Sequence, residues 1–245
     1  MSQIDYIVVI PARYNSTRLP GKPLIDIAGK PMIQRVFEQC TKVVDSNLVY
    51  IATDDDRIRR TCESFGAKVV ITSSDCLTGT DRVAEVSKMI NAHYYINVQG
   101  DEPLFNSADI KLLVDHINFE EDEILMGYSS IHSKADFENR AIPKMIFSEQ
   151  KQLLYMSRSP IPGNKKDEFA GAWRQVCAYA YPKTALEVFS SVNSKTPIEE
   201  IEDLEMLRFL EKGVSIKVIE MSSESIAVDY PEDIEKVLKR LDHET

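Results

Sequence analysis

Three cationic side chains stand close together in one loop near the amino terminus. Arg13, Arg18 and Lys22 lie in the segment PARYNSTRLPGKPL (residues 11–24), directly after the first apolar run. Gly21 lets the backbone approach a ligand closely, and cations combined with backbone amides form a cradle for phosphate. The segment matches neither GxxxxGK[ST] nor GxGxxG. We therefore predict a phosphate site of another type, against the alternative of a solvated basic loop.

Two aspartates are candidates for metal binding. Asp101 follows the apolar run at residues 94–98 and stands behind Gly100, and Asp229 follows a short apolar stretch near the carboxyl end. Because Mg²⁺ prefers one or two carboxylates together with phosphate oxygens of a substrate, we predict that Asp101 binds magnesium, and the residues alone leave Asp229 open between a metal ligand and a helix cap. The alternatives are a turn aspartate at Asp101 and a cap at Asp229 for the helix predicted at residues 231–241.

Three further segments carry polar side chains that suit a ligand site. In TGTDR (residues 78–82), Gly79 and Thr80 either cap a helix or present their backbone to a nucleobase. Arg158 lies in the Pro-flanked loop SRSPIP, where an arginine can hold a carboxylate through two hydrogen bonds; the alternative is a surface arginine. The acidic run at residues 199–205 is interpreted as a mostly solvated helix face, with one or two carboxylates facing a polyhydroxy ligand.

The elements that position these residues follow from hydrophobic periodicity. Short apolar runs predict buried strands, and amphipathic stretches predict helices between them. In an open sheet of parallel strands, ligands bind beyond the carboxyl ends of the strands, where the cationic loop and Asp101 fall. In the first half, the predicted strands are residues 6–10, 48–52, 68–71 and 94–98, and the predicted helices are residues 31–41, 57–65 and 81–90.

The second half is less regular and suggests a smaller substrate lobe with some antiparallel strands. We expect one domain over residues 1–245, with a regular half to about residue 120 and a less regular half beyond it. The expected fold class is α/β, with a mostly parallel central sheet and helices on both faces. The predicted strands here are residues 124–131, 141–147, 153–156, 176–181 and 216–220, and the predicted helices are residues 201–210 and 231–241.

Composition excludes several classes of protein. The net charge is −10, from 29 basic and 39 acidic residues, which argues against a nucleic-acid or anionic-membrane binder. The four cysteines form no CxxC pair, and the four histidines show no metal-ligand spacing. No apolar run is long enough for a signal peptide or a membrane span. We therefore expect a soluble cytoplasmic protein with free thiols.

Taken together, these motifs resemble the 3-deoxy-manno-octulosonate cytidylyltransferase (CMP-Kdo synthetase) family. The resemblance runs from about residue 7 to residue 237, through ARYNSTRLPGKPL, TGTDR, NVQGDEP, YMSRSPIP, PIEEIEDLEMLR and VDYPEDIEKV. It implies a Rossmann-like nucleotide-diphospho-sugar transferase fold and a Mg²⁺-dependent reaction. In that reaction CTP and a 3-deoxy-octulosonic acid give CMP-sugar, a precursor of cell-envelope lipopolysaccharide, and pyrophosphate. The family also implies that the half to about residue 120 binds the nucleotide, and that the half beyond it binds the sugar and forms a homodimer.

The resemblance assigns a role to each candidate residue. The nucleotide contacts would be Ala12, Arg13, Arg18, Lys22, Thr80, Arg82 and Asp101; the catalytic residues Arg18, Lys22 and Asp101; the sugar contacts Gln99, Arg158, Gln175, Tyr179 and Glu205; and the magnesium ligands Asp101 and Asp229. No histidine lies in these motifs, so we predict no histidine base. The proton acceptor stays open between a metal-bound hydroxide, an aspartate and solvent.

One strand departs from the family pattern. Where the family commonly has His-Leu-Gly-Ile-Tyr-Gly-Tyr, this chain has QVCAYAY, with Gln175 in place of histidine and Cys177 in place of glycine. An amide offers two donors and an acceptor where a neutral imidazole offers one of each. The acceptor is therefore open among 3-deoxy-octulosonate, another ulosonic or amino sugar, and a non-acidic sugar. A uridylyl- or guanylyltransferase and a non-catalytic nucleotide-sugar-binding module are the remaining alternatives.

Overall fold

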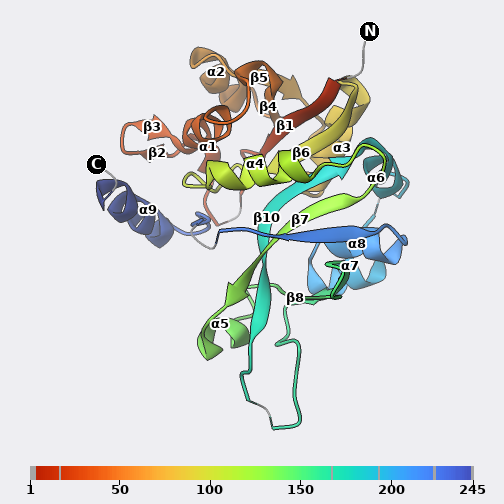
Figure 1. The fold of residues 1–245 in the computed structure, drawn as a ribbon. Helices are drawn as coiled ribbons and strands as arrows, with labels where there is room; N and C mark the ends of the chain where they lie inside the picture. Colours follow the sequence, from red (N-terminus) through yellow and green to blue (C-terminus); the bar gives the residue numbers. More distant parts are fainter. Residues whose placement is uncertain (1–3, 17, 167, 193, 223–224, 244–245) are drawn as a thin grey trace.

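One mixed β-sheet runs through the whole chain (Figure 1). The structure is a computed structural model that describes residues 4–16, 18–166, 168–192, 194–222 and 225–243. The strands of this sheet are β1 (Ile4–Ala12), β4 (Val49–Thr53), β5 (Lys68–Ile71), β6 (Ala92–Val98), β7 (Ile124–Ile131), β8 (Lys144–Phe147), β9 (Leu153–Ser157), β10 (Ala172–Pro182) and β11 (Ile216–Glu220). Within the described residues their order is β11-β7-β10-β6-β1-β4-β5, and β8 and β9 extend the sheet from β10.

Helices cover both faces of this sheet, as predicted. Val83 of α3 and Leu186 of α6 pack in the core on one face, while Ile33 of α1 and Ile58 of α2 pack on the other. The helices of the described residues are α1 (Met32–Thr41), α2 (Asp56–Ser64), α3 (Gly79–Met89), α4 (Ser107–His116), α5 (Lys134–Glu138), α6 (Lys183–Phe189), α7 (Pro197–Glu202), α8 (Met206–Glu211) and α9 (Pro231–His243). A short hairpin of β2 (Asp26–Ile27) and β3 (Lys30–Pro31), and the 3₁₀ turns η1 (Lys22–Leu24) and η2 (Ser46–Leu48), complete the elements.

The first half has the predicted parallel order. Strand β1 pairs in parallel with β4 on one side and β6 on the other, and β4 pairs in parallel with β5. The side chains of Ile7, Val8, Val9 and Ile10 are fully buried, because helices cover this central strand on both faces. The carboxyl ends of β1 and β6 therefore meet at the same edge of the sheet.

The start of α3 corrects one prediction. Thr78 caps this helix, and neither Gly79 nor Thr80 does. The Thr78 hydroxyl accepts from the amide of Asp81 at 3.1 Å, and the Asp81 carboxylate accepts from the amide of Thr78 at 2.9 Å. This reciprocal capping box leaves Gly79 and Thr80 in the first turn, with their amides free to bind another group.

The second half joins the same sheet and also forms a smaller lobe. Strand β10 lies antiparallel to β6 and to β7, and its first residues pair with β8, so this one strand belongs to both parts. The lobe of β8, β9 and α5 lies at the bottom of Figure 1, away from the nucleotide-binding half proposed from the sequence. A mostly parallel sheet with a smaller mixed β lobe was the predicted architecture.

The helix predicted over residues 201–210 is wrong in extent. The chain forms α7 and α8, and Asp203 separates them with a backbone φ of 51° in the left-handed region. The acidic run is mostly solvated, as predicted, since Glu200 and Asp203 are exposed, while Glu199 has no exposed surface and Glu205 is half-buried. Asp203 accounts for the break, since aspartate is among the few residues that tolerate this conformation.

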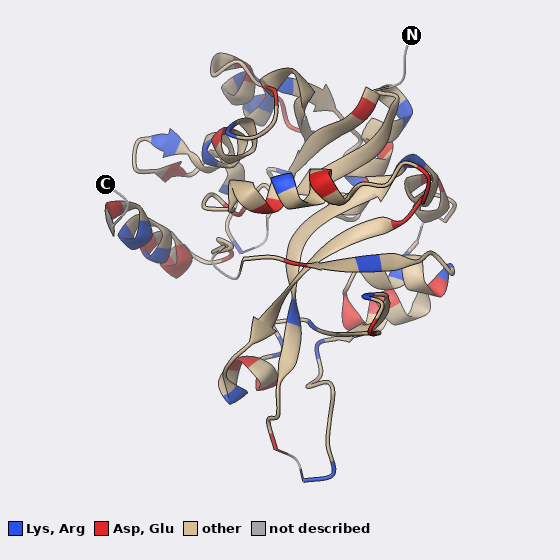
Figure 2. Ribbon diagram, in the orientation of Figure 1, with Lys and Arg blue, Asp and Glu red and all other residues tan. Residues whose placement is uncertain are grey.

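Charge and surface agree with the composition. Charged side chains lie mainly on helices and loops, with both signs interspersed, and the central strands carry few (Figure 2). All four cysteines are free thiols. Among the described residues no helix is long and apolar enough to cross a membrane.

Candidate active site

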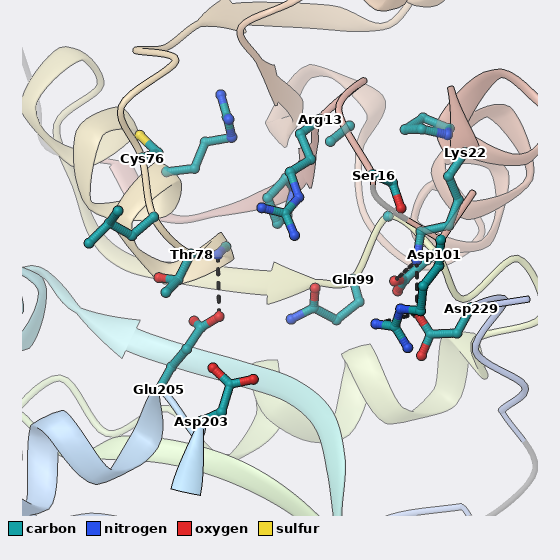
Figure 3. Close-up of a pocket in the computed structure, with 18 of the residues that line it drawn as sticks. Arg13, Ser16, Lys22, Cys76, Thr78, Gln99, Asp101, Asp203, Glu205 and Asp229 are labelled. Atoms are coloured by element: carbon teal, nitrogen blue, oxygen red, sulfur yellow. Dashed lines mark hydrogen bonds and ion pairs between the residues drawn. The ribbon is translucent and has the colours of Figure 1, made fainter. Parts of the chain in front are cut away.

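A cavity of about 310 Å³ opens at the carboxyl ends of β1 and β6 (Figure 3). Its walls come from the loop after β1, the segment 76–82 that enters α3, residues 99–101 after β6, the segment 195–205 around α7, and Asp229. This is the edge of the sheet at which ligands bind in open α/β folds. Ala12, Arg13, Arg18, Lys22, Arg82, Gln99, Asp101, Glu205 and Asp229 of the predicted set line it.

One end of the cavity holds a cation between two carboxylates. The Nζ of Lys22 lies 2.6 Å from Oδ2 of Asp101 and 3.2 Å from Oδ1 of Asp229. Arg18 approaches the same Asp229 oxygen at 3.4 Å. Arg13 extends toward the middle of the cavity (Figure 3). The structure thus brings the two predicted metal ligands and the three predicted phosphate cations to one place.

Two backbone contacts hold these segments together. Gly100 passes so close to β1 that a Cβ there would lie 2.6 Å from the carbonyl oxygen of Pro11. The amide of Val228 donates to the carbonyl of Asp101 at 2.9 Å. Asp101 and Asp229 lie 79 and 207 positions from Lys22 in the sequence, and both contact its ammonium group. Gly100 permits the close approach of the segment that carries Asp101. The hydrogen bond of Val228 holds the segment that carries Asp229.

The Asp101 and Asp229 carboxylates fit a magnesium ion. They already share one cation, Lys22, and both are hard oxygen donors of the kind that Mg²⁺ prefers. Among the described residues no group of three or more His, Cys, Asp or Glu side chains is arranged to hold a metal. Two carboxylates suffice where a substrate supplies phosphate oxygens as further ligands.

The opposite end of the cavity is built on the start of α3. Glu205 accepts hydrogen bonds from the amide of Gly79 at 3.3 Å and the amide of Thr80 at 3.0 Å, and also from the Thr80 hydroxyl. Burial raises the pKa of Glu205, and the bonds from Thr80 oppose that rise. The Thr80 hydroxyl also lies 3.2 Å from that of Tyr181. Gln99 lies between this end and the Lys22 end (Figure 3).

Arg82 is a wall residue whose guanidinium is already occupied. It donates to the hydroxyl of Thr72 and to the carbonyl of Ser73 at 3.4 Å, and it pairs with Asp54 at 3.4 Å. Only 4% of the residue is exposed. These contacts hold the loop that leads into α3 in place. The predicted contact of Arg82 with the nucleotide would therefore have to be made by the 4% of the residue that is exposed.

Three predicted sugar contacts do not line the cavity. Arg158 donates to the carbonyl of Glu202 at 2.7 Å and to that of Asp203 at 3.0 Å, so its guanidinium supports the turn between α7 and α8. Gln175 donates to the hydroxyl of Tyr179, which is itself buried and stacked 5.5 Å from Tyr181.

Sequence reasoning missed Lys195, and of the acidic run at residues 199–205 it assigned only Glu205 to the site. Lys195 and Asp203 line the cavity and form an ion pair of 2.6 Å. A signal was present: Thr196 and Glu199 have the spacing of a capping box. That spacing predicts a helix start at residue 197, which would have turned Glu199 inward.

Comparison with known proteins identifies the family. Residues 7–219 match the family model described as cytidylyltransferase. The chain belongs to the cytidylyltransferase family. It is 39% identical over 233 residues to the 3-deoxy-manno-octulosonate cytidylyltransferase of Escherichia coli, with 94% of each chain covered.

Two further similarities cover nearly the whole cytidylyltransferase. It is 40% identical to the 8-amino-3,8-dideoxy-manno-octulosonate cytidylyltransferase of Shewanella sp. (strain W3-18-1), over 97% of this chain and 99% of that protein. Its fold matches a solved structure of CMP:2-keto-3-deoxy-manno-octonic acid synthetase complexed with CTP. The TM-score is 0.92 at 37% identity, covering 98% of this chain and 100% of that one.

Glu102 gives the cytidylyltransferase a carboxyl that titrates near neutrality beside the cavity. Burial raises its pKa to about 7, and the hydrogen bond from the Ser225 hydroxyl opposes the rise. Asp101 and Asp109 raise the pKa further, while Arg174 lowers it. Only 6% of Glu102 is exposed, so its ionisation leaves a charge inside the protein.

We predict that Glu102→Gln stabilises the cytidylyltransferase at high pH. The pKa of Glu102 is raised in the folded chain above its ordinary value of 4.5, because the neutral carboxyl suits the buried position. The contribution of this carboxyl to the stability of the wild-type protein is therefore complete below pH 4.5, and it is lost as the pH rises to about 7 and Glu102 ionises. At pH 8.5 the variant should unfold with a larger free energy than wild type, by about 3 kcal/mol at most. Urea unfolding at pH 4 and pH 8.5 measures this, and a difference that does not change with pH would contradict it.

Proposed function

We propose that this cytidylyltransferase transfers CMP from CTP to a 3-deoxy-octulosonic acid, with Mg²⁺, and releases pyrophosphate. The observation that carries the proposal is the convergence of Lys22, Asp101 and Asp229 at one end of a cavity whose other end holds Glu205. The near full-length likeness to cytidylyltransferases named for 3-deoxy-manno-octulosonate supports this choice of acceptor.

The cationic end suits the triphosphate. Arg13, Arg18 and Lys22 would bind its phosphate oxygens, and Asp101 and Asp229 would hold the magnesium ion, which supplies charge neutralisation of the phosphates when bound. The sugar hydroxyl oxygen forms a bond to the α-phosphorus, and the bond from that phosphorus to the oxygen leading to the β-phosphate breaks. The cations stabilise the negative charge that collects on the departing pyrophosphate.

The opposite end suits a polyhydroxy acid. Gln99 and Glu205 offer acceptors and donors for hydroxyl groups, and Lys195 offers a cation to a carboxylate. We propose that the half to about residue 120 binds the nucleotide and that the remainder binds the sugar.

A second acceptor deserves a place in the same proposal. Asp203 and Glu205 line the sugar end, and carboxylates favour a ligand that carries an ammonium group. The likeness to proteins named 8-amino-3,8-dideoxy-manno-octulosonate cytidylyltransferase supports this alternative. In either case the product would serve cell-envelope lipopolysaccharide synthesis in the cytoplasm.

We also propose a homodimer built through the lobe of β8 and β9. Leu154 on β9 is 60% exposed, and among the described strands β9 pairs only with β8, so it presents an open edge. Exposed apolar side chains on an open edge suit an interface between chains. Sedimentation of the purified protein at the 27.8 kDa of one chain would contradict this proposal.

Pyrophosphate release tests the reaction directly. The protein is incubated with CTP, Mg²⁺ and each of several sugars, including 3-deoxy-manno-octulosonate, its 8-amino analogue and a non-acidic hexose. We expect release with an octulosonic acid and none with the hexose, and Asp101→Asn should lower turnover by about 100-fold or more. Pyrophosphate release with the hexose alone among the sugars would contradict the proposal. So would the absence of release with every combination of nucleotide and sugar.

Gln175→His tests the origin of acceptor choice. Gln175 contacts Tyr179, so the change alters the side chain that supports that tyrosine beside the sugar end. We expect the ratio of kcat/KM for 3-deoxy-manno-octulosonate to that for the 8-amino analogue to rise by about tenfold, with KM for CTP unchanged. An unchanged ratio would show that the strand carrying Gln175 does not set the acceptor.

A further inference from the structure

Arg208 of α8 is a buried cation that contacts two walls of the cavity without lining it. Its Nε and Nη2 atoms each lie 2.7 Å from a different carboxylate oxygen of Glu199, and its Nη1 lies 3.1 Å from Oδ1 of Asp81. The residue is 1% exposed, and its guanidinium carbon lies 3.7 Å from the ring centre of Phe189. Both partners come from other helices, α7 and α3.

Each of the two carboxylates belongs to a capping box. Asp81 completes the box that Thr78 begins at the start of α3, and Glu199 completes the box that Thr196 begins at the start of α7. A capping box determines where its helix begins and how the chain enters it. One guanidinium therefore ties together the first turns of two helices.

These two helix starts form opposite walls of the cavity. The entry to α3 contributes Leu77, Thr78 and Gly79, and the entry to α7 contributes Lys195. The walls also meet directly, because Glu205 accepts from the amides of Gly79 and Thr80. The backbone amide of Arg208 donates to the carbonyl of Glu205 at 3.1 Å in the first turn of α8, so Arg208 and Glu205 belong to the same helix start.

Stability alone does not account for this arrangement. Removing three charges from water costs free energy that their attraction only partly returns, and apolar side chains of similar volume are often equally stable in such places. What a planar guanidinium adds is direction, since it binds one carboxylate through two parallel bonds and a second at a fixed angle. The structure uses this direction to set the positions of two helix starts.

We propose that Arg208 is a positioning residue for nucleotidyl transfer, because it fixes the spacing between the α3 and α7 walls and thereby places Glu205 and Lys195 against the sugar acid. This inference rests on the proposed function. It assigns no contact between Arg208 and substrate. The cations and carboxylates around Lys22 lie at the other end of the cavity and have no contact with Arg208 among the interactions described, so triphosphate binding is expected to survive its loss.

The first measurement is steady-state kinetics of Arg208→Lys, Arg208→Met and Glu199→Gln. We expect kcat/KM for the sugar acid to fall by about 100-fold in Arg208→Met, since a displacement of about 1 Å can have that effect, while the Kd for CTP changes by less than about fivefold. Arg208→Lys should retain part of the activity, because it keeps the charge and loses the paired bonds. The matched control is Tyr94→Phe, which removes the buried 2.8 Å bond to the carbonyl of Glu121 away from the cavity.

The second measurement needs no substrate. Hydrogen exchange should become about tenfold faster in Arg208→Met at the amides of residues 79–80 and of residues 198–202, and stay unchanged in α4. Wild-type kinetics together with unchanged exchange in Arg208→Met would overturn the inference. If wild type itself uses no sugar acid, the proposed function fails, and hydrogen exchange still decides whether Arg208 ties the walls. If Arg208→Met does not fold, Arg208→Lys and Glu199→Gln carry the same two tests.

Discussion

The active site depends on one electrostatic arrangement, in which the Lys22 ammonium lies between the carboxylates of Asp101 and Asp229. Two carboxylates at this separation from a common point repel each other, and a cation between them removes that repulsion. The loop after β1, the loop after β6 and the segment before α9 must all keep their paths for this contact to exist. We propose that a magnesium ion would bind the same two carboxylates, so that Lys22 and the metal would compete for one position, and that the triphosphate would offer Lys22 another partner.

The sheet brings the second half of the chain next to this arrangement. Strand β10 enters between β6 and β7 and runs antiparallel to both, which places the second half of the chain beside the carboxyl end of β6. The start of α3 and the α7–α8 turn then face each other across the end of the cavity that Glu205 lines. The contacts of Arg208 and Glu205 hold this end of the cavity together. The contacts of Lys22 with Asp101 and Asp229 hold the other end together. The cavity thus has a charged end that is suited to phosphate and a hydrogen-bonding end that is suited to hydroxyl groups.

Much of this was predictable from local sequence, and the exceptions have physical causes. The apolar run at β1 and the strand before Gly100 identified the edge where ligands bind, because a strand covered on both faces is apolar throughout. The break at Asp203 was not predicted, since periodicity continues through PIEEIEDLEMLR while a left-handed residue interrupts the helix. The direction of Arg158 was not predicted either, because carbonyls of a turn that was not foreseen accept its hydrogen bonds.

Metal binding in the absence of nucleotide tests the exchange between Lys22 and the metal most directly. The affinity for Mn²⁺, used as a spectroscopic substitute for Mg²⁺, is measured by electron paramagnetic resonance for wild type, Lys22→Met and the control Lys30→Met, whose ammonium pairs with Glu38 away from the cavity. Lys22→Met removes the competing cation, so it should bind Mn²⁺ about tenfold more tightly than wild type and the control. Equal or weaker binding by Lys22→Met would show that the ammonium and the metal do not share the Asp101–Asp229 position.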